Sequence, residues 1–170
     1  RLRRDGVLFE SAYTPHPETT PAIASLLTGL DPPRHGVRAL YQKLHADNRS
    51  LAETLADAGY ETAAFVSSFV MIRDFSGLDQ GFATYDDFVT ERELNRDNYE
   101  RRAAATLALA RDSLARRDRA RPLFLFLHLI DPHGPYDPPE PWASRFRTEE
   151  EIPIRGAVPL YQRLPGVDRL

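Results

Sequence analysis

The chain has 170 residues with 22 Lys and Arg against 25 Asp and Glu, and its formal net charge of −3 does not favour binding to nucleic acid through bulk charge. Apolar residues make up 42% and charged residues 28%, which is typical of one globular domain with a core of useful size. The sequence contains no cysteine, which excludes disulfides, thiolate metal ligands and a cysteine nucleophile.

Two elements are predicted at the start of the chain. Val7–Tyr13 alternates in part between apolar and polar side chains and predicts a strand, after a helical turn that stops at Gly6. Pro21–Leu30 predicts a short helix, because proline is favoured at the first helical position and Gly29 lies near the end of the segment.

The middle of the chain predicts a helix followed by a buried strand. Ser50 and Glu53 have the spacing of a capping box at the start of "SLAETLADAGY", and Gly59 ends that helix. The residues that follow are apolar or β-branched, and they predict a strand over Thr62–Val66.

The remaining pattern predicts one long helix and one more strand. The helix runs from Thr90 to about Arg119, with a second capping box formed by Thr90 and Glu93. Leu123–Ile130 is an unbroken apolar run, as expected for a strand covered on both faces. Helices and strands alternate, so the predicted class is α/β, with a largely parallel sheet flanked by helices.

The stretch "TPHPETTPAIASLLTGL" contains the first candidate site. With Pro21 as the first helical residue, Thr20 is the expected N-cap and a candidate substrate-binding residue, and Thr19 lies just outside the helix. Unpaired N–H groups and the helix dipole favour a phosphate or sulfate there, and His16 is close enough to approach the same anion. An alkoxide on Thr19 would be stabilised by this field and by a metal ion. The alternative is that both threonines only cap a helix in a structural domain.

The second candidate site is the proline-rich loop after the last predicted strand, "HLIDPHGPYDPP". His133 lies past the strand in a stiffened loop, where histidine can bind an anion or protonate a leaving group. His128 is expected to be a buried histidine with one satisfied hydrogen bond, and Asp131 to be a turn former. His35, which precedes a glycine in a turn, is expected to be structural.

These segments resemble blocks of the sulfatase family, in the alkaline-phosphatase-like superfamily. "TTPAIASLLTGLDPPRHGV" is similar to its signature region, and "SLAETLADAGYETAAFVSSF" and "FLFLHLIDPHGPYDPP" follow as the next blocks in the right order. The resemblance implies an alkaline-phosphatase-like fold and metal-assisted hydrolysis of sulfate esters. It places Thr19 at the nucleophile position and His133 at a contact to the sulfate or phosphate oxygens.

The resemblance also implies a cofactor and a class of partner. The cofactor is a divalent metal (calcium, magnesium, manganese or zinc), with Thr19 as one ligand. The substrate is a small-molecule or glycan sulfate or phosphate ester, and a periplasmic or membrane-associated location is compatible with the family. The family's first-strand aspartates and late metal ligands have no counterpart here, so residues 1–170 are expected to form an incomplete sulfatase-like domain that lacks the first strand and the C-terminal half.

Three departures from the family pattern leave two functions open. Threonine is not a substrate for oxidation to formylglycine, the family's arginine four places later is Ile23, and its Gly-Lys-x-His stretch reads Ser67-Ser68-Phe69. A threonine nucleophile suits phosphoryl displacement, so the first hypothesis is a hydrolase of sulfate or phosphate esters. The second is a catalytically degenerate family member that binds an anionic glycan or lipid head group.

Overall fold

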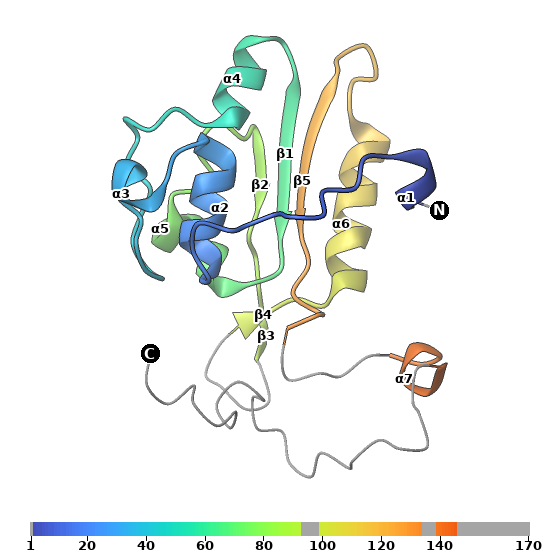
Figure 1. Ribbon diagram of the computed structural model, residues 1–170. Coiled ribbons are helices and arrows are strands. Elements are labelled where there is room, and N and C mark those ends of the chain that lie inside the picture. Colours follow the sequence, from blue (N-terminus) through green and yellow to red (C-terminus); the bar gives the residue numbers. More distant parts are fainter. Residues whose placement is uncertain (1, 93–98, 134–138, 146–170) are drawn as a thin grey trace, which may run out of the picture.

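A small parallel sheet lies at the centre of the computed structural model, which describes residues 2–92, 99–133 and 139–145 (Figure 1). Its strands are β1 (Glu61–Val66), β2 (Thr84–Asp86) and β5 (Leu123–His128), in the order β2-β1-β5. Strands β3 (Glu91–Arg92) and β4 (Tyr99–Glu100) form a separate antiparallel pair. The predicted α/β class with a parallel sheet is confirmed.

The helices before and after the strands supply the two outer layers. No helix in the described ranges combines the length and the apolar character needed to cross a membrane. The helical elements are α1 (Leu2–Asp5), α2 (Thr19–Thr28), α3 (Pro32–His35), α4 (Leu51–Asp57), the 3-10 turn η1 (Phe69–Met71), α5 (Arg73–Ser76), α6 (Ala103–Arg116) and α7 (Trp142–Arg145).

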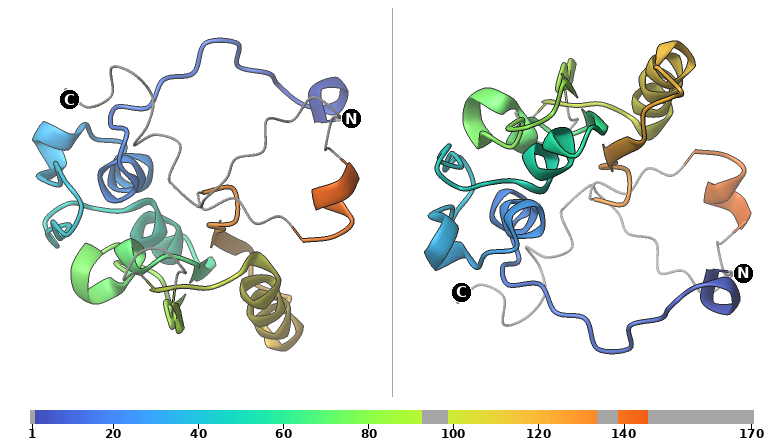
Figure 2. Two further views of the ribbon diagram at one scale, coloured as in Figure 1. Left: turned by 90° about the horizontal axis from the view of Figure 1, so that it is seen from below. Right: turned by 90° about the horizontal axis from the view of Figure 1, so that it is seen from above.

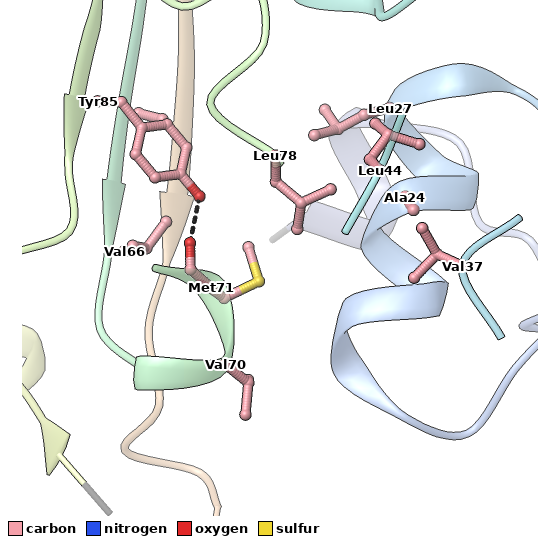
Figure 3. Packing of buried hydrophobic residues seen from close by; sticks show 10 residues of the cluster. Ala24, Leu27, Val37, Leu44, Val66, Val70, Met71, Leu78 and Tyr85 are labelled. Carbon is pink, nitrogen blue, oxygen red and sulfur yellow. Dashed lines mark hydrogen bonds between the residues drawn. The ribbon is translucent and has the colours of Figure 1, made fainter. Parts of the chain in front are cut away.

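The two faces of the sheet bury different helices, because side chains alternate along each strand. On one face, Ala64 and Val66 join a hydrophobic cluster that includes Ala24 and Leu27 of α2. Figure 3 shows this packing, with the fully buried side chain of Met71 among the apolar residues. The hydroxyl of Tyr85 donates a hydrogen bond to the backbone carbonyl of Met71 over 2.7 Å.

The opposite face packs against α6. Ala63 and Phe65 of β1 form a smaller cluster with Ala110, and Leu123 and Leu125 of β5 pack against it. Figure 2 shows α2 and α6 on opposite sides of the strands. Each residue of β1 and β5 can therefore be assigned to the α2 face or the α6 face by its place in the alternation.

The helix predicted at Ser50 begins as expected. The hydroxyl of Ser50 accepts from the N–H of Glu53 at 3.0 Å, and the Glu53 carboxylate accepts from the N–H of Ser50 at 2.8 Å. Gly81 packs against this helix start with φ +84°, and a Cβ there would lie 2.3 Å from the Glu53 nitrogen. Only glycine fits this approach.

The strand predicted over Val7–Tyr13 is wrong. These residues form no regular element, and the side chains of Val7, Phe9 and Tyr13 are 83%, 78% and 90% exposed. Figure 2 shows the segment as an arc that stands away from the sheet. A strand needs a neighbour to take up its backbone hydrogen bonds, and no described strand lies beside this one.

The long helix predicted from Thr90 is wrong in its first half and right in its second. The chain pairs as β3 and β4 before α6 begins at Ala103, and Glu93 of the expected capping box lies outside the described residues. The N–H of Arg101 bonds to the carbonyl of Ser67 at 2.9 Å, which holds this segment to the end of β1. Tertiary pairing thus overrides the local helical pattern.

The last predicted strand is confirmed as β5, but the expectation that both of its faces are buried is not confirmed. It ends at His128, earlier than expected, and its residues are half-buried or exposed. In the described part of the chain, β5 is paired only with β1 and forms an edge of the sheet. Tyr136 and Asp137 of the following loop lie outside the described residues.

Candidate active site at the carboxyl edge of the sheet

The two candidate loops lie at the same edge of the sheet. Because β1 and β5 are parallel, Val66 and His128 at their carboxyl ends are paired side by side. The side chain of Thr20, at the start of α2, donates to the carbonyl of Val70 just beyond β1 at 3.0 Å. The start of α2 and the loop containing His133 are therefore both at the edge where α/β sheets bind ligands (Figure 1).

Thr19, and not Pro21, is the first residue of α2, and Glu18 is its N-cap. The prediction that Thr20 caps the helix is therefore wrong. Thr20 is fully buried, and its hydroxyl is used by the Val70 carbonyl, so its side chain joins two structural elements. Pro21 lies two positions later in the helix than expected. It is tolerated there because the N–H groups of the first turn have no acceptor within the helix, so a residue without an N–H loses no hydrogen bond.

The side chain of Thr19 is half-buried, and its hydroxyl makes no hydrogen bond within the described part of the chain. No side chain caps the ten-residue helix α2, so the N–H groups of Thr19 and Thr20 have no partner in the helix. The nearby Glu18 carboxylate accepts from the N–H of Leu40 at 3.2 Å. The positive end of the helix dipole thus remains available to an anion beside the Thr19 oxygen.

His16 is held against the start of the same helix. Its Nδ1 accepts from the N–H of Glu18 at 3.1 Å, and its carbonyl accepts from the hydroxyl of Thr14 at 2.8 Å. A neutral imidazole that accepts at Nδ1 carries its proton on Nε2. His16 therefore has an N–H to offer to an anion, as its predicted role requires.

His133 lies in an exposed turn directly after β5. Its N–H donates to the carbonyl of Ile130 at 2.7 Å, which closes the turn. Asp131 does more than the turn forming expected of it, because its carboxylate accepts from the N–H of Ala103 at 2.8 Å. This contact caps the start of α6 and fixes the exit of β5 to it.

Two further histidines, His35 and His128, differ in how their ring nitrogens are hydrogen-bonded. His35 is structural, as predicted: its Nε2 lies 2.9 Å from the hydroxyl of Ser25, and its Nδ1 accepts from the N–H of Val37 at 3.1 Å. His128 is not the satisfied histidine expected, because its buried Nδ1 has no partner among the described residues. Burial lowers the pKa of both rings.

The positions where the family pattern has cations carry none here. Ile23 packs against the α2-face core, and the hydroxyl of Ser67 is 2.7 Å from that of Thr106 in a buried contact. A buried cation that the sequence did not reveal, Arg101, lies at the same edge, but it is paired with Asp86. Local pattern placed Arg101 inside a helix, where a single arginine is ordinary.

Two surface grooves run beside the N-terminal segment. The first, of about 560 Å³, lies between that segment and α2, and the second, of about 540 Å³, is lined by His16 and Arg38 among others. Neither groove is lined by Thr19 or His133. The described residues contain no group of three or more His, Cys, Asp or Glu side chains that could hold a metal ion.

The parallel sheet and the loops at its carboxyl edge define an α/β protein whose candidate site lies where such sheets bind ligands. The sulfatase family model matches residues 1–163, and the chain belongs to the sulfatase family. It is 31% identical over 137 residues to human N-sulphoglucosamine sulphohydrolase, covering 78% of this chain and 26% of that protein. It is 27% identical over 195 aligned residues to an arylsulfatase of Clostridium perfringens, covering 88% of this chain and 40% of the relative.

Solved structures agree with this fold. One, of a protein in complex with its substrate D-glucosamine-2-N,6-O-disulfate, gives a TM-score of 0.60 at 21% identity over 76% of this chain and 28% of the other. A second, from work on the metabolism of glycosaminoglycans by Bacteroides thetaiotaomicron, gives 0.53 at 19% identity over 76% and 35%. The chain thus spans between about a quarter and two fifths of the proteins that it resembles.

Proposed function

We propose that the whole protein hydrolyses a sulfate or phosphate ester, with Thr19 as the nucleophile. The observation that carries this proposal is the position of Thr19 at the uncapped start of α2, with a hydroxyl that no described residue engages. Membership of the sulfatase family supports ester hydrolysis. The resemblance of "TTPAIASLLTGLDPPRHGV" to the family signature supports the choice of residue.

The reaction we propose is an in-line displacement. The Thr19 hydroxyl loses its proton to solvent and its oxygen attacks the sulfur or phosphorus, while the bond to the ester oxygen breaks. The leaving oxygen takes a proton, for which His133 is the proposed donor. Water then hydrolyses the ester formed on Thr19. The free N–H groups at the start of α2, together with His16, stabilise the charge on the transferred group.

A divalent metal is part of the proposal as a ligand of the Thr19 oxygen. Such an ion would lower the pKa of the hydroxyl and neutralise the ester oxygens. Thr19 is the one ligand that we assign to it, because the described residues form no larger ligand group. The proposal places the remaining ligands of this ion outside the described residues.

The proposed substrate is a sulfated or phosphorylated sugar. The human relative is named for hydrolysis of N-sulphoglucosamine, and a sulfated amino sugar is the substrate class that this likeness supports. The threonine favours direct attack on a phosphoryl group, because it cannot be oxidised to the formylglycine on which other family members depend. Sulfate and phosphate esters of glucosamine are therefore the pair of substrates to compare.

A second function is favoured by two observations. Ile23 and Ser67 leave the anion without the arginine and lysine that the family pattern provides, and both side chains are committed to the core or to a buried hydroxyl contact. A protein with this site would bind an anionic glycan or lipid head group without turnover.

Substitution of Thr19 separates the two functions. The full-length protein, supplied with magnesium, manganese, calcium or zinc, should hydrolyse nitrophenyl phosphate or nitrophenyl sulfate. Thr19→Ala should abolish this activity, while Thr19→Ser, which keeps the hydroxyl, should retain part of it. Absence of turnover in both the wild type and Thr19→Ala, with inorganic phosphate still bound by both, would favour the binding function.

A further inference from the structure

His128 presents a polar atom that the described fold does not explain. Its Nδ1 is shielded from solvent and has no hydrogen-bond partner, and it is the one buried side-chain polar atom in the described residues of which this is true. Buried polar groups are nearly always hydrogen-bonded, so this exception marks His128 as a residue whose ring the described fold does not hold.

The side chain of His128 lies on the same face of the sheet as α2. Side chains alternate along a strand, and Phe124 and Phe126 pack against the cluster that contains the α2 residues. His128 is the next residue in that series. It is also paired in register with Val66, which belongs to the same cluster. The imidazole therefore lies on the α2 face at the carboxyl end of β5.

This position brings three separate features to one corner of the fold. The start of α2 is fastened beyond the end of β1 by the bond from Thr20 to Val70, and β1 is the strand adjacent to β5. His133, which follows β5, is close enough to His128 for its charge to lower the pKa of that ring, in addition to the larger effect of burial. Thr19, His133 and His128 thus share one edge of the sheet.

The unpartnered nitrogen also determines which ring nitrogen carries the proton. A buried N–H without an acceptor is costlier than a buried lone pair without a donor, so the neutral ring places its proton on Nε2. Nε2 is absent from the shielded, unpartnered atoms, and no hydrogen bond from it to a described residue is found. His128 therefore has an N–H donor that the described fold does not use.

We propose that His128 is a further anion-binding residue of the same site, whose Nε2–H donates to an oxygen of the sulfuryl or phosphoryl group of the substrate. This inference rests on the proposed function, because it takes the Thr19 hydroxyl as the point to which that group is delivered. It gives the carboxyl edge of the sheet a hydrogen-bond donor to the anion in addition to His133. Such donors are few there, because the cations of the family pattern are missing.

Two substitutions in the full-length protein distinguish the ring nitrogens. In His128→Gln the side-chain amide reaches the place of Nε2, whereas in His128→Asn it reaches the place of Nδ1. We expect His128→Gln to keep the inhibition constants of inorganic sulfate and phosphate within a few-fold of wild type. His128→Asn and His128→Phe should weaken both by roughly tenfold or more, as for loss of a hydrogen bond to a charged group.

The melting temperature provides the structural control. His128→Phe removes a buried unpartnered polar atom, so its melting temperature should equal or exceed that of the wild type. Unchanged inhibition constants in His128→Phe would overturn the inference, as would equal weakening in the Gln and Phe variants accompanied by a lower melting temperature.

The same measurements separate this inference from the proposed function. If Thr19→Ala abolishes turnover while His128→Phe binds sulfate and phosphate normally, the inference fails and the proposed function stands. If the wild type shows no turnover, binding of inorganic phosphate followed by calorimetry still tests His128. A tenfold weaker affinity in His128→Phe then supports its role in anion binding and identifies the failure as that of catalysis.

Discussion

Thr20 donates its side-chain hydrogen bond to the carbonyl of Val70 over 3.0 Å, and this one contact joins the start of α2 to the turn that follows β1. The side chain next to the proposed nucleophile is thus structural, and it fixes the position of Thr19 relative to the sheet. The two neighbouring threonines have different environments: Thr20 is fully buried, and Thr19 is half-buried with a hydroxyl that no described residue engages.

Replacing Thr20 by valine should therefore affect stability and activity together. Valine fits the space but leaves the Val70 carbonyl buried without its donor, which costs about 1–3 kcal/mol of unfolding free energy. Hydrolysis should also fall, because the start of α2 is no longer fastened to the edge of the sheet. Denaturant unfolding and steady-state kinetics measure the two effects. Thr20→Ser, which retains the hydroxyl, is the matched control, and equal stability of Thr20→Val and wild type would contradict this role.

The ion pair between Arg101 and Asp86 should be important for stability. The Arg101 side chain is 7% exposed and also donates to the carbonyl of Val66 at 2.8 Å, so Arg101→Met leaves buried acceptors and a carboxylate without a partner. We expect a loss of about 3–5 kcal/mol in the free energy of unfolding.

The exposed pair between Arg49 and Asp57 is the control for this prediction. Its two side chains are 61% and 70% exposed, and Arg49→Met should change the unfolding free energy by less than about 1 kcal/mol. Similar losses of unfolding free energy in Arg49→Met and Arg101→Met would contradict the prediction that the buried Arg101 pair stabilises the fold more than the exposed pair.

His35 should make the fold sensitive to acid. Burial lowers the pKa of this ring below its ordinary value of 6.5, so the unfolded state binds a proton at higher pH than the folded state. Its contribution to stability is therefore complete above pH 6.5 and is lost as the pH falls toward the folded pKa. His128 shifts in the same direction, so the effect of His35 is measured as a difference between variants.

His35→Asn isolates this contribution. Asparagine can still accept from the N–H of Val37 but does not titrate, so the variant should be less stable at neutral pH and should lose less stability below pH 6.5 than the wild type. Urea unfolding at a series of pH values gives the comparison. Parallel stability curves for the two proteins would contradict the prediction.

Removal of divalent metal should abolish hydrolysis if the Thr19 oxygen is a metal ligand. Treatment of the full-length protein with a chelator should reduce turnover to the background rate, and adding back magnesium, manganese, calcium or zinc should restore it. Isothermal titration should show weaker binding of the restoring metal to Thr19→Ala than to the wild type. Turnover that persists in a chelator would contradict the assignment of a metal to this oxygen.

Local signals predicted the parts of the fold whose causes are local. The capping box of Ser50 and Glu53 and the apolar run of β5 were both recognised, because each depends on neighbouring residues. The Val7–Tyr13 segment and the long helix from Thr90 were mispredicted, since an extended segment without a paired neighbour forms no strand and Arg101 is held by the end of β1.

The candidate site was predictable to a similar extent. Sequence reasoning placed the two candidate loops after the predicted strands Val7–Tyr13 and Leu123–Ile130. The second strand forms as β5, whereas the first does not form, and the start of α2 is held at the edge of the sheet by the bond from Thr20 to Val70 instead. It did not reveal that Thr20 is committed to Val70 or that the Nδ1 of His128 lacks a partner. The first property depends on a contact between residues 50 positions apart in sequence, and the second depends on the absence of a contact. Neither property has a local sequence signature.

The most direct test of the central claim is to find the group that becomes attached to the protein during turnover. The full-length protein would be mixed with a glucosamine sulfate or phosphate ester, quenched rapidly in acid, digested and measured by mass spectrometry. Our proposal predicts a peptide containing Thr19 that is heavier by one sulfuryl or phosphoryl group and is absent from Thr19→Ala. Attachment of that group to a different residue, or turnover by Thr19→Ala at the wild-type rate, would contradict it.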